Sequence, residues 1–409
     1  MTDEEHEYPH EHLFARPVRE SMGGAEYGAW RSIANADAAA LSFGFPFPES
    51  FPGDELLAAT EAVVEEEGTD ALQYGGSDCA DRLVEWTAEH ARERGMDADD
   101  DEVLLTNGGS HGLDLVCRAF LDPGDRIVVE APTFMGALRL FENFGVAVET
   151  VSMDDDGIDV EALERHLQAD ADDGRDPPKL LYTIPNFQNP TGVTLSRERR
   201  ERLLDLAAEH DFVIVEDDAY GDLRYDGDPI APLRAIDEER ADGGRVIHLG
   251  TFSKLIAPGV RAGWAVADGT VRDQLRRLNS GGSNTTFMRS VLGKYVDGGH
   301  LDAAIPELRQ AYEHRRDHML AALADYMPPE AEWSEPDGGF FVWLELPEHV
   351  DAEAILEDAI DEGATYLPGR WFYDDDRGAN CMRLSFSYEA LDGMERGIEG
   401  LGRAIERAL

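Results

Sequence analysis

The chain has 409 residues and carries 36 Lys and Arg against 85 Asp and Glu, a formal net charge of −49 at pH 7. Its length suggests two or three domains, with ample chain to bury a core. The acidic residues are spread along the whole chain, as in proteins kept soluble at high salt, and they repel nucleic acid and anionic membranes, so we expect neither as a partner.

The cysteines and the N-terminal sequence indicate a cytoplasmic protein. Cys79, Cys117 and Cys381 are odd in number and lack metal-ligand spacing, so we expect neither a disulfide framework nor a zinc site. The first residues show no basic region followed by an apolar core, and no run of ~18 apolar residues occurs. We interpret the histidines near the start as part of a solvated acidic lead-in rather than as metal ligands.

The first part of the chain is predicted to be mainly helical. Residues 13–34 can form a helix interrupted at a Gly-Gly pair, and helices follow at 54–67 and 78–95. Between them, three prolines remove hydrogen-bond donors and fix φ, which excludes a regular helix or a central strand. We therefore predict that residues 41–52 form an extended crossing segment.

From residue 103 onward, short apolar strands alternate with helices. Helices are predicted at 110–121, 134–144 and 196–210. The predicted strands are 103–105, 126–130, 146–151, 180–183, 212–216, 246–249 and 263–267. This alternation predicts an α/β fold in which a mostly parallel sheet is sandwiched by helices.

The pattern of predicted strands and helices changes near residue 298. A long amphipathic helix at 301–326 is followed by fewer apolar runs, which predict a small α+β domain. Its predicted strands and helices lie at 338–347, 351–362, 364–367, 382–386 and 391–409. The acidic patches at 170–176 and 374–376 are predicted to be solvated loops.

The sequence thus predicts that the chain has three regions. We expect a lead-in with a helix at 1–40 that packs on the small domain. A large ligand-binding domain at 41–298 and a small C-terminal α+β domain at 299–409 complete the chain.

Lys254 stands among small and apolar residues, between a predicted strand and the turn at Pro258-Gly259. Desolvation there would disfavour the ammonium form, and the neutral amine can form a Schiff base with a carbonyl cofactor. The alternative is a lysine paired with a nearby carboxylate. The motifs around Lys254 decide between the two.

Ligands of open parallel sheets bind beyond the carboxyl ends of the strands. The Gly-rich turn at 106–112 opens a helix and can bind an anion, although most such turns are only turns. Phe134 is either core or a flat wall for a planar ring, and Asn189, held extended by the following proline, has an amide free to donate. Asp217, at the end of a buried strand, needs a cationic partner such as a protonated pyridine nitrogen.

Five motifs in this order carry a resemblance to a known family. They are Asn189-Pro-Thr-Gly192, Asp217-Asp-Ala-Tyr220, Ser253-Lys254, Gly338-Gly-Phe-Phe-Val-Trp and Arg383-Leu-Ser-Phe-Ser. The set resembles the class I/II pyridoxal-phosphate aminotransferases of fold type I, from about residue 41 to the C-terminus. Within this family, the sequence is most similar to the branch of 2-aminoadipate, aromatic and branched-chain aminotransferases. That branch also resembles the effector domain of MocR-type regulators.

The resemblance implies pyridoxal 5'-phosphate as cofactor. Lys254 resembles the Schiff-base lysine, Asp217 the partner of the pyridine nitrogen, and Asn189 with Tyr220 the donors to the phenolate oxygen. Asp217 is preferred to Asp218 because it lies on the same strand face as alternate valines of its strand. The residues that match the phosphate grip are Gly109, Ser110, His111, Thr251 and Arg261. His111 stands where the family often has a small polar residue or Gln.

The resemblance also implies substrate and subunit contacts. Phe134 resembles the residue that stacks on the cofactor ring. Tyr74 resembles a tyrosine that reaches the phosphate of the neighbouring subunit's cofactor, which implies a homodimer with shared active sites. Arg383 resembles the arginine that binds the substrate α-carboxylate, with Asn189 and Gly44 beside it. A structural ion pair is the alternative for Arg383 in a chain so rich in acid.

The sequence therefore predicts an aminotransferase that exchanges an amino group between an L-amino acid and a 2-oxo acid such as 2-oxoglutarate. The amino acid is expected to be aromatic, branched-chain or 2-aminoadipate. Another reaction on the same cofactor, by a β-lyase or a racemase, remains open because the motifs fix the cofactor more firmly than the outcome. A non-catalytic MocR-like module is disfavoured by the net charge of −49 and by the lack of a helix-turn-helix pattern.

Overall fold

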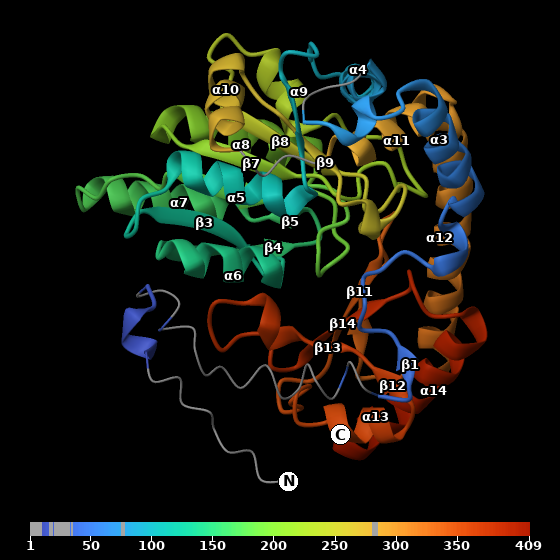
Figure 1. Ribbon diagram of the computed structural model, residues 1–409. Helices are drawn as coiled ribbons and strands as arrows, with labels where there is room; N and C mark the ends of the chain where they lie inside the picture. The colour runs from blue at the N-terminus through green and yellow to red at the C-terminus, as the bar shows by residue number, and fades with distance from the viewer. Residues whose placement is uncertain (1–9, 16–18, 20–32, 34–35, 75–77, 280–284) are drawn as a thin grey trace.

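The computed structural model describes residues 10–15, 19, 33, 36–74, 78–279 and 285–409. Figure 1 shows a large sheet between helices, in the upper part of the view, above a smaller sheet. The helix predicted at 13–34 lies largely outside the described residues. Among the described residues, no helix has the length and apolarity needed to cross a bilayer.

The large sheet is mostly parallel, as predicted. Its order is β2-β9-β8-β7-β6-β3-β4-β5, and β4, β3, β6, β7 and β8 run parallel, while β9 and β5 are antiparallel to their neighbours. The strands are β2 (Val103–Thr106), β3 (Arg126–Ala131), β4 (Ala147–Asp154), β5 (Gly157–Ile158), β6 (Leu180–Thr183), β7 (Val213–Asp217), β8 (Val246–Thr251) and β9 (Gly263–Val266).

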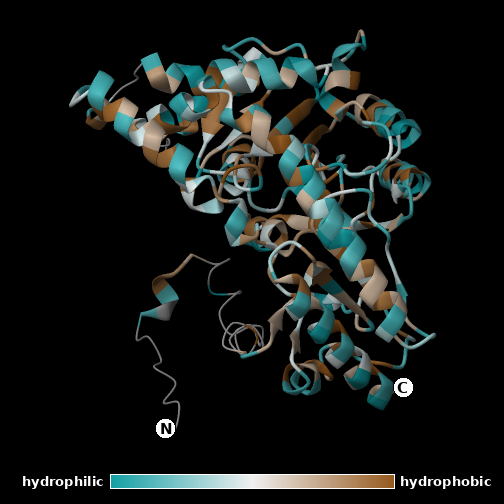
Figure 2. Cartoon of the chain, turned by 90° about the vertical axis from the view of Figure 1, so that its right-hand side faces the viewer, coloured by the Kyte–Doolittle hydropathy of each residue, from teal (hydrophilic) through white to brown (hydrophobic). Residues whose placement is uncertain are grey.

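Helices cover both faces of the large sheet because its strands are apolar on both sides. Val128 and Ile214 pack toward one layer, and their neighbours Val129 and Val215 toward the other. The layers are α7 (Val160–Asp172), α8 (Arg197–His210) and α9 (Leu233–Glu238) on one face, and α5 (Gly109–Phe120), α6 (Met135–Phe144) and α10 (Gly269–Leu278) on the other. Figure 2 shows brown strands between helices whose outer sides are teal.

Side-chain caps define where several helices begin. Asp159, Ser196, Asp268 and Thr285 each accept a hydrogen bond from a backbone N–H in the first turn of α7, α8, α10 and α11 (Thr286–Asp297). Helix α5 begins differently, after Gly108 at a φ of 91° and without a side-chain cap. Its first N–H groups are therefore not satisfied by a capping side chain.

The small sheet has the order β10-β11-β14-β13, and all its pairs are antiparallel. A parallel pair, β1 with β12, lies beside it. Helix α12 (His300–Tyr326) links the two sheets, because Leu308 near its start packs in the core with β2 and β9, and Met319 packs in the core of the small sheet. The remaining elements are α3 (Gly53–Glu66), α4 (Asp78–Glu93), α13 (Leu356–Asp361), α14 (Leu391–Ala408), β1 (Ala39–Ala40), β10 (Glu332–Trp333), β11 (Phe341–Glu345), β12 (Ala364–Thr365), β13 (Leu367–Pro368) and β14 (Cys381–Ser385).

One acidic patch differs from its prediction as a solvated loop. Residues 170–172 belong to α7, and Asp170 is buried. The arginines Arg126 and Arg175 bind its carboxylate, which offsets the cost of burying a charge. A second difference is that the strand predicted at 364–367 is divided into β12 and β13.

Candidate active site

A cavity of about 360 Å³ lies where the carboxyl ends of the large sheet's strands face the small sheet. It is lined mostly by apolar surface, with a few polar side chains that converge on it. The predicted site residues that line it are Gly44, Gly109, Ser110, Phe134, Asn189, Asp217, Tyr220, Thr251, Lys254, Arg261 and Arg383.

The sequence contains three lysines, and Lys254 differs from the other two. Lys179 and Lys294 form ion pairs with Asp125 and Glu66. Lys254 points into the cavity, where its Nζ donates to the Gly44 carbonyl oxygen at 2.7 Å. Among the described residues no carboxylate forms an ion pair with Lys254, which disfavours the structural ion pair that the sequence left open.

The surroundings of Lys254 favour a neutral amine. Burial, together with the nearby charge of Arg383, lowers the pKa of Lys254 to about 8, against the opposing effect of Asp217. Two aromatic rings act in the opposite direction, because a ring face attracts the ammonium form, and Nζ lies 5.4 Å from the centre of the Phe340 ring and 5.9 Å from that of Tyr220. A lysine in this state is a competent nucleophile and base near neutral pH.

The two adjacent aspartates at the end of β7 face opposite ways. Asp217 lines the cavity, where its Oδ2 accepts a hydrogen bond from the Tyr182 hydroxyl at 2.7 Å. Asp218 turns away and binds Arg94 and Asn186. Burial raises the pKa of Asp217 to about 6. A cationic ligand beside Asp217 would remove much of the cost of its burial.

Arg383, on β14, is a buried cation at the opposite wall. It is 5% exposed, and it donates from Nη1 to Asn189 Oδ1 at 2.9 Å and from Nη2 to the Ser42 carbonyl at 2.6 Å. Its Nε is buried without a partner, and burial lowers its pKa to about 10. Among the described residues no carboxylate pairs with it. Arg383 therefore lacks the structural ion pair that was its alternative.

Tyr220 also lines the cavity, near both Asp217 and Arg383, and its hydroxyl keeps its proton. Its ring packs edge-on against Phe340 and Phe341, with centroids 5.4 and 5.8 Å away. Burial raises the pKa of its hydroxyl, although Arg383 acts in the opposite direction. Tyr220 is therefore a hydrogen-bond donor on the cavity wall.

The N-terminus of α5 forms an anion site at one end of the cavity. Gly109 and Ser110 begin the helix there, with the positive end of its dipole toward the cavity. The guanidinium of Arg261 donates to the Asn107 carbonyl at 2.8 Å, and a Cβ on Gly108 would come within 2.8 Å of that guanidinium. Thr251 adds a hydroxyl, held 3.0 Å from Ser253 Oγ.

The residues present fit pyridoxal phosphate. Phe134 offers a flat wall, and Gly136 leaves it room, because a Cβ there would lie 2.5 Å from the ring. The cavity thus joins an aromatic wall, an anion site, a carboxylate and a lysine of lowered pKa. These match a planar ring, a phosphate, a protonated ring nitrogen and a carbonyl carbon.

Two predicted residues do not line the cavity. The His111 backbone N–H donates to the Gly108 carbonyl at 3.1 Å, and its Nδ1 accepts from the Asn107 N–H at 3.0 Å, so both groups serve the turn itself. Tyr74 is fully exposed and is not among the residues that line the cavity of its own subunit.

Sequence reasoning missed Ser42, Tyr182, Met135 and Leu367. Ser42 contributes a carbonyl oxygen, which has no side-chain signal. Tyr182 lies within a strand predicted at 180–183, and no motif marks it; pairing of β6 with β7 places its hydroxyl on Asp217. Met135 and Leu367 add apolar side chains to the lining of the cavity.

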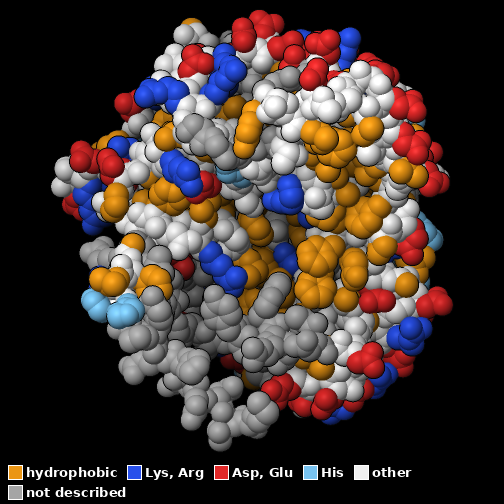
Figure 3. All heavy atoms as spheres, in the orientation of Figure 1, with side chains coloured by type: hydrophobic (Ala, Val, Ile, Leu, Met, Phe, Trp, Pro, Cys, Tyr) orange, Lys and Arg blue, Asp and Glu red, His pale blue; other side chains and the backbone are white. Residues whose placement is uncertain are grey.

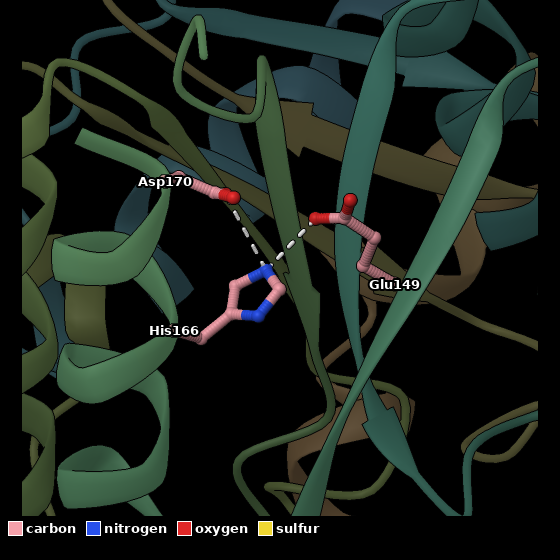
Figure 4. A group of neighbouring side chains, drawn as sticks. All are labelled: Glu149, His166 and Asp170. Atoms are coloured by element: carbon pink, nitrogen blue, oxygen red, sulfur yellow. Dashed lines mark hydrogen bonds and ion pairs between the residues drawn. The ribbon is translucent and has the colours of Figure 1, made fainter. Parts of the chain in front are cut away.

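A second group of possible metal ligands lies on β4 and α7 (Figure 4). His166 Nε2 is 2.9 Å from Glu149 Oε2 and 3.6 Å from Asp170 Oδ2. Burial acts to raise the pKa of both carboxyls, but hydrogen bonds from Arg126 outweigh it and hold both pKa values below their usual range. The cluster is an ion-pair network whose arginine cations are Arg126 and Arg175, and it supplies no reason to place a metal there.

Comparisons with known proteins agree with this geometry. The chain matches the family Aminotransferase class I and II over residues 49–399. It is 41% identical over 380 residues to aromatic-amino-acid aminotransferase 1 of Thermococcus litoralis, covering 92% of this chain and 90% of that protein. It is 35% identical over 372 residues to the 2-aminoadipate transaminase of Thermus thermophilus, covering 90% and 91%.

A solved structure extends the likeness to the whole fold. Kynurenine aminotransferase of Pyrococcus horikoshii, in complex with PMP, superposes with a TM-score of 0.90 at 39% identity and covers 98% of both chains. The expected fold type and cofactor are thereby confirmed, and transamination is favoured over the β-lyase, racemase and effector-binding alternatives. The chain belongs to the class I and II aminotransferases, and it is a pyridoxal-phosphate-dependent transaminase.

Proposed function

We propose that this transaminase acts on L-amino acids with aromatic side chains and uses a 2-oxo acid such as 2-oxoglutarate as acceptor. The observation that carries the proposal is Arg383, a buried cation without a carboxylate partner among the described residues, which stands beside an apolar wall. A bidentate guanidinium suits an α-carboxylate. The apolar wall then faces the substrate side chain.

Each polar residue has a defined task in this proposal. Pyridoxal phosphate, when bound, supplies a ring that accepts electrons from the substrate. Asp217 holds the proton on the ring nitrogen, and the N-terminus of α5 with Arg261 binds the phosphate. The Nζ of Lys254 carries the proton that leaves the substrate Cα. Asn189 orients Arg383 through its Oδ1.

An aromatic cluster supports a large planar side chain in the substrate. Phe43 and Phe45 line the cavity and stack with centroids 5.0 Å apart. Tyr388 packs edge-on against both, at 6.4 and 5.9 Å. The aromatic ring of a substrate could make an offset-stacked or edge-on contact with these rings. Branched-chain amino acids and 2-aminoadipate, for which the Thermus thermophilus relative is named, are the weaker candidates because their side chains cannot stack.

A panel of amino donors with 2-oxoglutarate tests this proposal. We expect tyrosine, phenylalanine and tryptophan to give the highest kcat/KM, with glutamate as a product. A clear preference for 2-aminoadipate or leucine would contradict the proposed preference for aromatic amino acids. Release of pyruvate and ammonia, without a new amino acid, would instead indicate β-elimination.

The cavity belongs to a homodimer in our proposal. Apolar side chains gather on the right-hand half of the face in Figure 3, where Figure 1 places α3 and α12. The exposed apolar residues of α3 and its surroundings are Phe51, Leu57, Val64, Leu72 and Tyr74. Exposed apolar side chains that gather on one face are a mark of protein–protein contact sites. A second copy on this face would cover it and bring Tyr74 toward the neighbouring cavity.

Mixing two inactive variants tests the shared site. Lys254→Ala and Tyr74→Ala chains, unfolded and refolded together, should form mixed dimers in which one site contains both native residues. Recovered activity supports the shared site. An active monomer at all concentrations, or no recovery in proven mixed dimers, opposes it.

We also propose a cytoplasmic protein adapted to high salt. The three free, buried cysteines and the net charge of −49 support this proposal. Between ~0.1 M and ~2 M KCl the Debye length shortens several-fold, so repulsion among the acidic residues weakens. The melting temperature should therefore rise with KCl. A flat melting temperature opposes the salt adaptation, and recovery of the protein outside the cytoplasm of fractionated cells opposes the location.

A further inference from the structure

Tyr182 stands behind the cavity and donates a hydrogen bond to Asp217 Oδ2 at 2.7 Å. It is 1% exposed and lies in the middle of the large sheet, in register with Val129 of β3 and Val215 of β7. Its ring packs edge-on against Phe141 of α6, with centroids 5.6 Å apart. Strand pairing on both sides and this packing fix the position of the hydroxyl.

The charge of Asp217 depends on its neighbours. Burial acts to raise its pKa, and the hydrogen bond from Tyr182 acts to lower it by stabilising the carboxylate. Asp218 adds to the rise, whereas His248 and Lys254 oppose it. The other titratable groups that face Asp217 from the packed elements are Glu130 of β3 and Tyr220. Tyr182 is the neighbour that donates directly to the carboxylate.

We propose that Tyr182 is a positioning residue for the cofactor, whose hydroxyl orients the Asp217 carboxylate and keeps it charged toward the protonated ring nitrogen. This inference rests on the proposed function, since it requires Asp217 to face that nitrogen. Because burial and the charge of Asp217 hold the pKa of Tyr182 well above its ordinary value, the hydroxyl remains a donor. One carboxylate oxygen is engaged by Tyr182, and the group can still accept from the cofactor.

Tyr182→Phe tests the role because it keeps the ring and removes only the hydroxyl. After the cofactor has been resolved from the full-length protein, we expect the Kd for pyridoxal phosphate to rise roughly ten- to a hundredfold, as a hydrogen bond to a charged group is lost. The loss of affinity toward acid pH should also begin at a higher pH, because the pKa of Asp217 rises.

A matched control removes another buried tyrosine hydroxyl. Tyr366 donates to the Ala352 carbonyl and does not line the cavity. Tyr366→Phe should lower the melting temperature without changing the Kd for the cofactor. Tyr182→Phe added to Asp217→Ala should raise the Kd no further, because the group through which Tyr182 acts is already absent.

Several outcomes would overturn the proposal. A folded Tyr182→Phe protein with unchanged Kd and pH profile is one, and a full further loss in the Asp217→Ala background is another. A crystal structure of the wild type with bound cofactor provides a check that needs no variant, and a Tyr182 hydroxyl turned away from Asp217 would oppose the role. Failure of the wild type itself to bind pyridoxal phosphate or to transaminate would instead defeat the proposed function.

Discussion

The two walls of the cavity are built in different ways. The wall we assign to the cofactor is formed by strand ends of one sheet, with Asp217 on β7, Thr251 on β8 and Lys254 just after it. The wall we assign to the substrate joins Arg383 of the small sheet to the Ser42 carbonyl and Asn189. Strand register fixes the first wall, whereas the second exists only where the two sheets meet.

The walls also differ in charge. The cofactor wall contains its own carboxylate, Asp217, for a cationic ring, and an anion site for a phosphate. The substrate wall presents Arg383, a buried cation that no carboxylate of the described residues neutralises. The cofactor wall thus offers a carboxylate and an anion site to a ligand that carries both charges, whereas the substrate wall offers a cation to a carboxylate.

Removal of Lys254 breaks the cofactor wall and should have the largest effect. In Lys254→Ala we expect kcat to fall at least ~10³-fold, because both the attachment point and the base are lost. The control Lys294→Ala removes a lysine paired with Glu66 away from the cavity and should keep wild-type kcat. Turnover by Lys254→Ala at the wild-type rate would remove it from the mechanism.

Removal of Arg383 breaks only the substrate wall. We expect Arg383→Ala to raise KM for the amino donor roughly ten- to a hundredfold, because charged hydrogen bonds to the carboxylate are lost, while the Kd for pyridoxal phosphate stays within about twofold. Arg316→Ala is a matched control, since Arg316 is buried but pairs with Asp226 and Asp317. An unchanged KM in Arg383→Ala would contradict the assignment.

Gly44 lies where the two walls touch. A Cβ on Gly44 would come within 2.5 Å of the Phe341 ring, so Gly44→Ala should push the segment aside and disturb the Ser42 carbonyl that holds Arg383. We expect KM for the donor to rise roughly three- to tenfold. Gly53→Ala, with open space around its Cβ position, should leave KM unchanged. Equal kinetics of the two variants would show that the segment is not a wall.

The pH dependence of cofactor addition measures how Arg383 on the substrate wall affects the pKa of Lys254 on the cofactor wall. Because the neutral amine reacts and the pKa of Lys254 is lowered to about 8, the rate of pyridoxal phosphate addition to the apoprotein should rise with pH, reach half its maximum near pH 8 and level off about one pH unit above that. Arg383 contributes to that lowering, so the Arg383→Ala profile should shift to higher pH. A wild-type rate that still rises toward pH 10 would contradict the buried state of Lys254.

The cofactor wall could be predicted from sequence because its residues follow apolar strands. Period-2 alternation selected Asp217 over Asp218, and the structure places Asp217 on the cavity and Asp218 on Arg94. The mostly parallel sheet was predicted for the same reason, since its strands are apolar on both faces.

The substrate wall and several helices were harder to predict. Ser42 acts through a backbone carbonyl, and the partner of Tyr182 is on another strand, so neither has a local signal. Helix α7 was missed because its acidic end resembles a loop, although Arg126 binds Asp170 and offsets its burial. Contacts between distant segments decide these features, and a single sequence does not display them.

The central claim is that Lys254, of the three lysines, holds the cofactor. Reduction with borohydride after loading with pyridoxal phosphate fixes the cofactor to its lysine, and peptide mass spectrometry then locates it. We predict one modified peptide, the one that contains Lys254. Modification of Lys179 or Lys294 with Lys254 untouched would contradict the account.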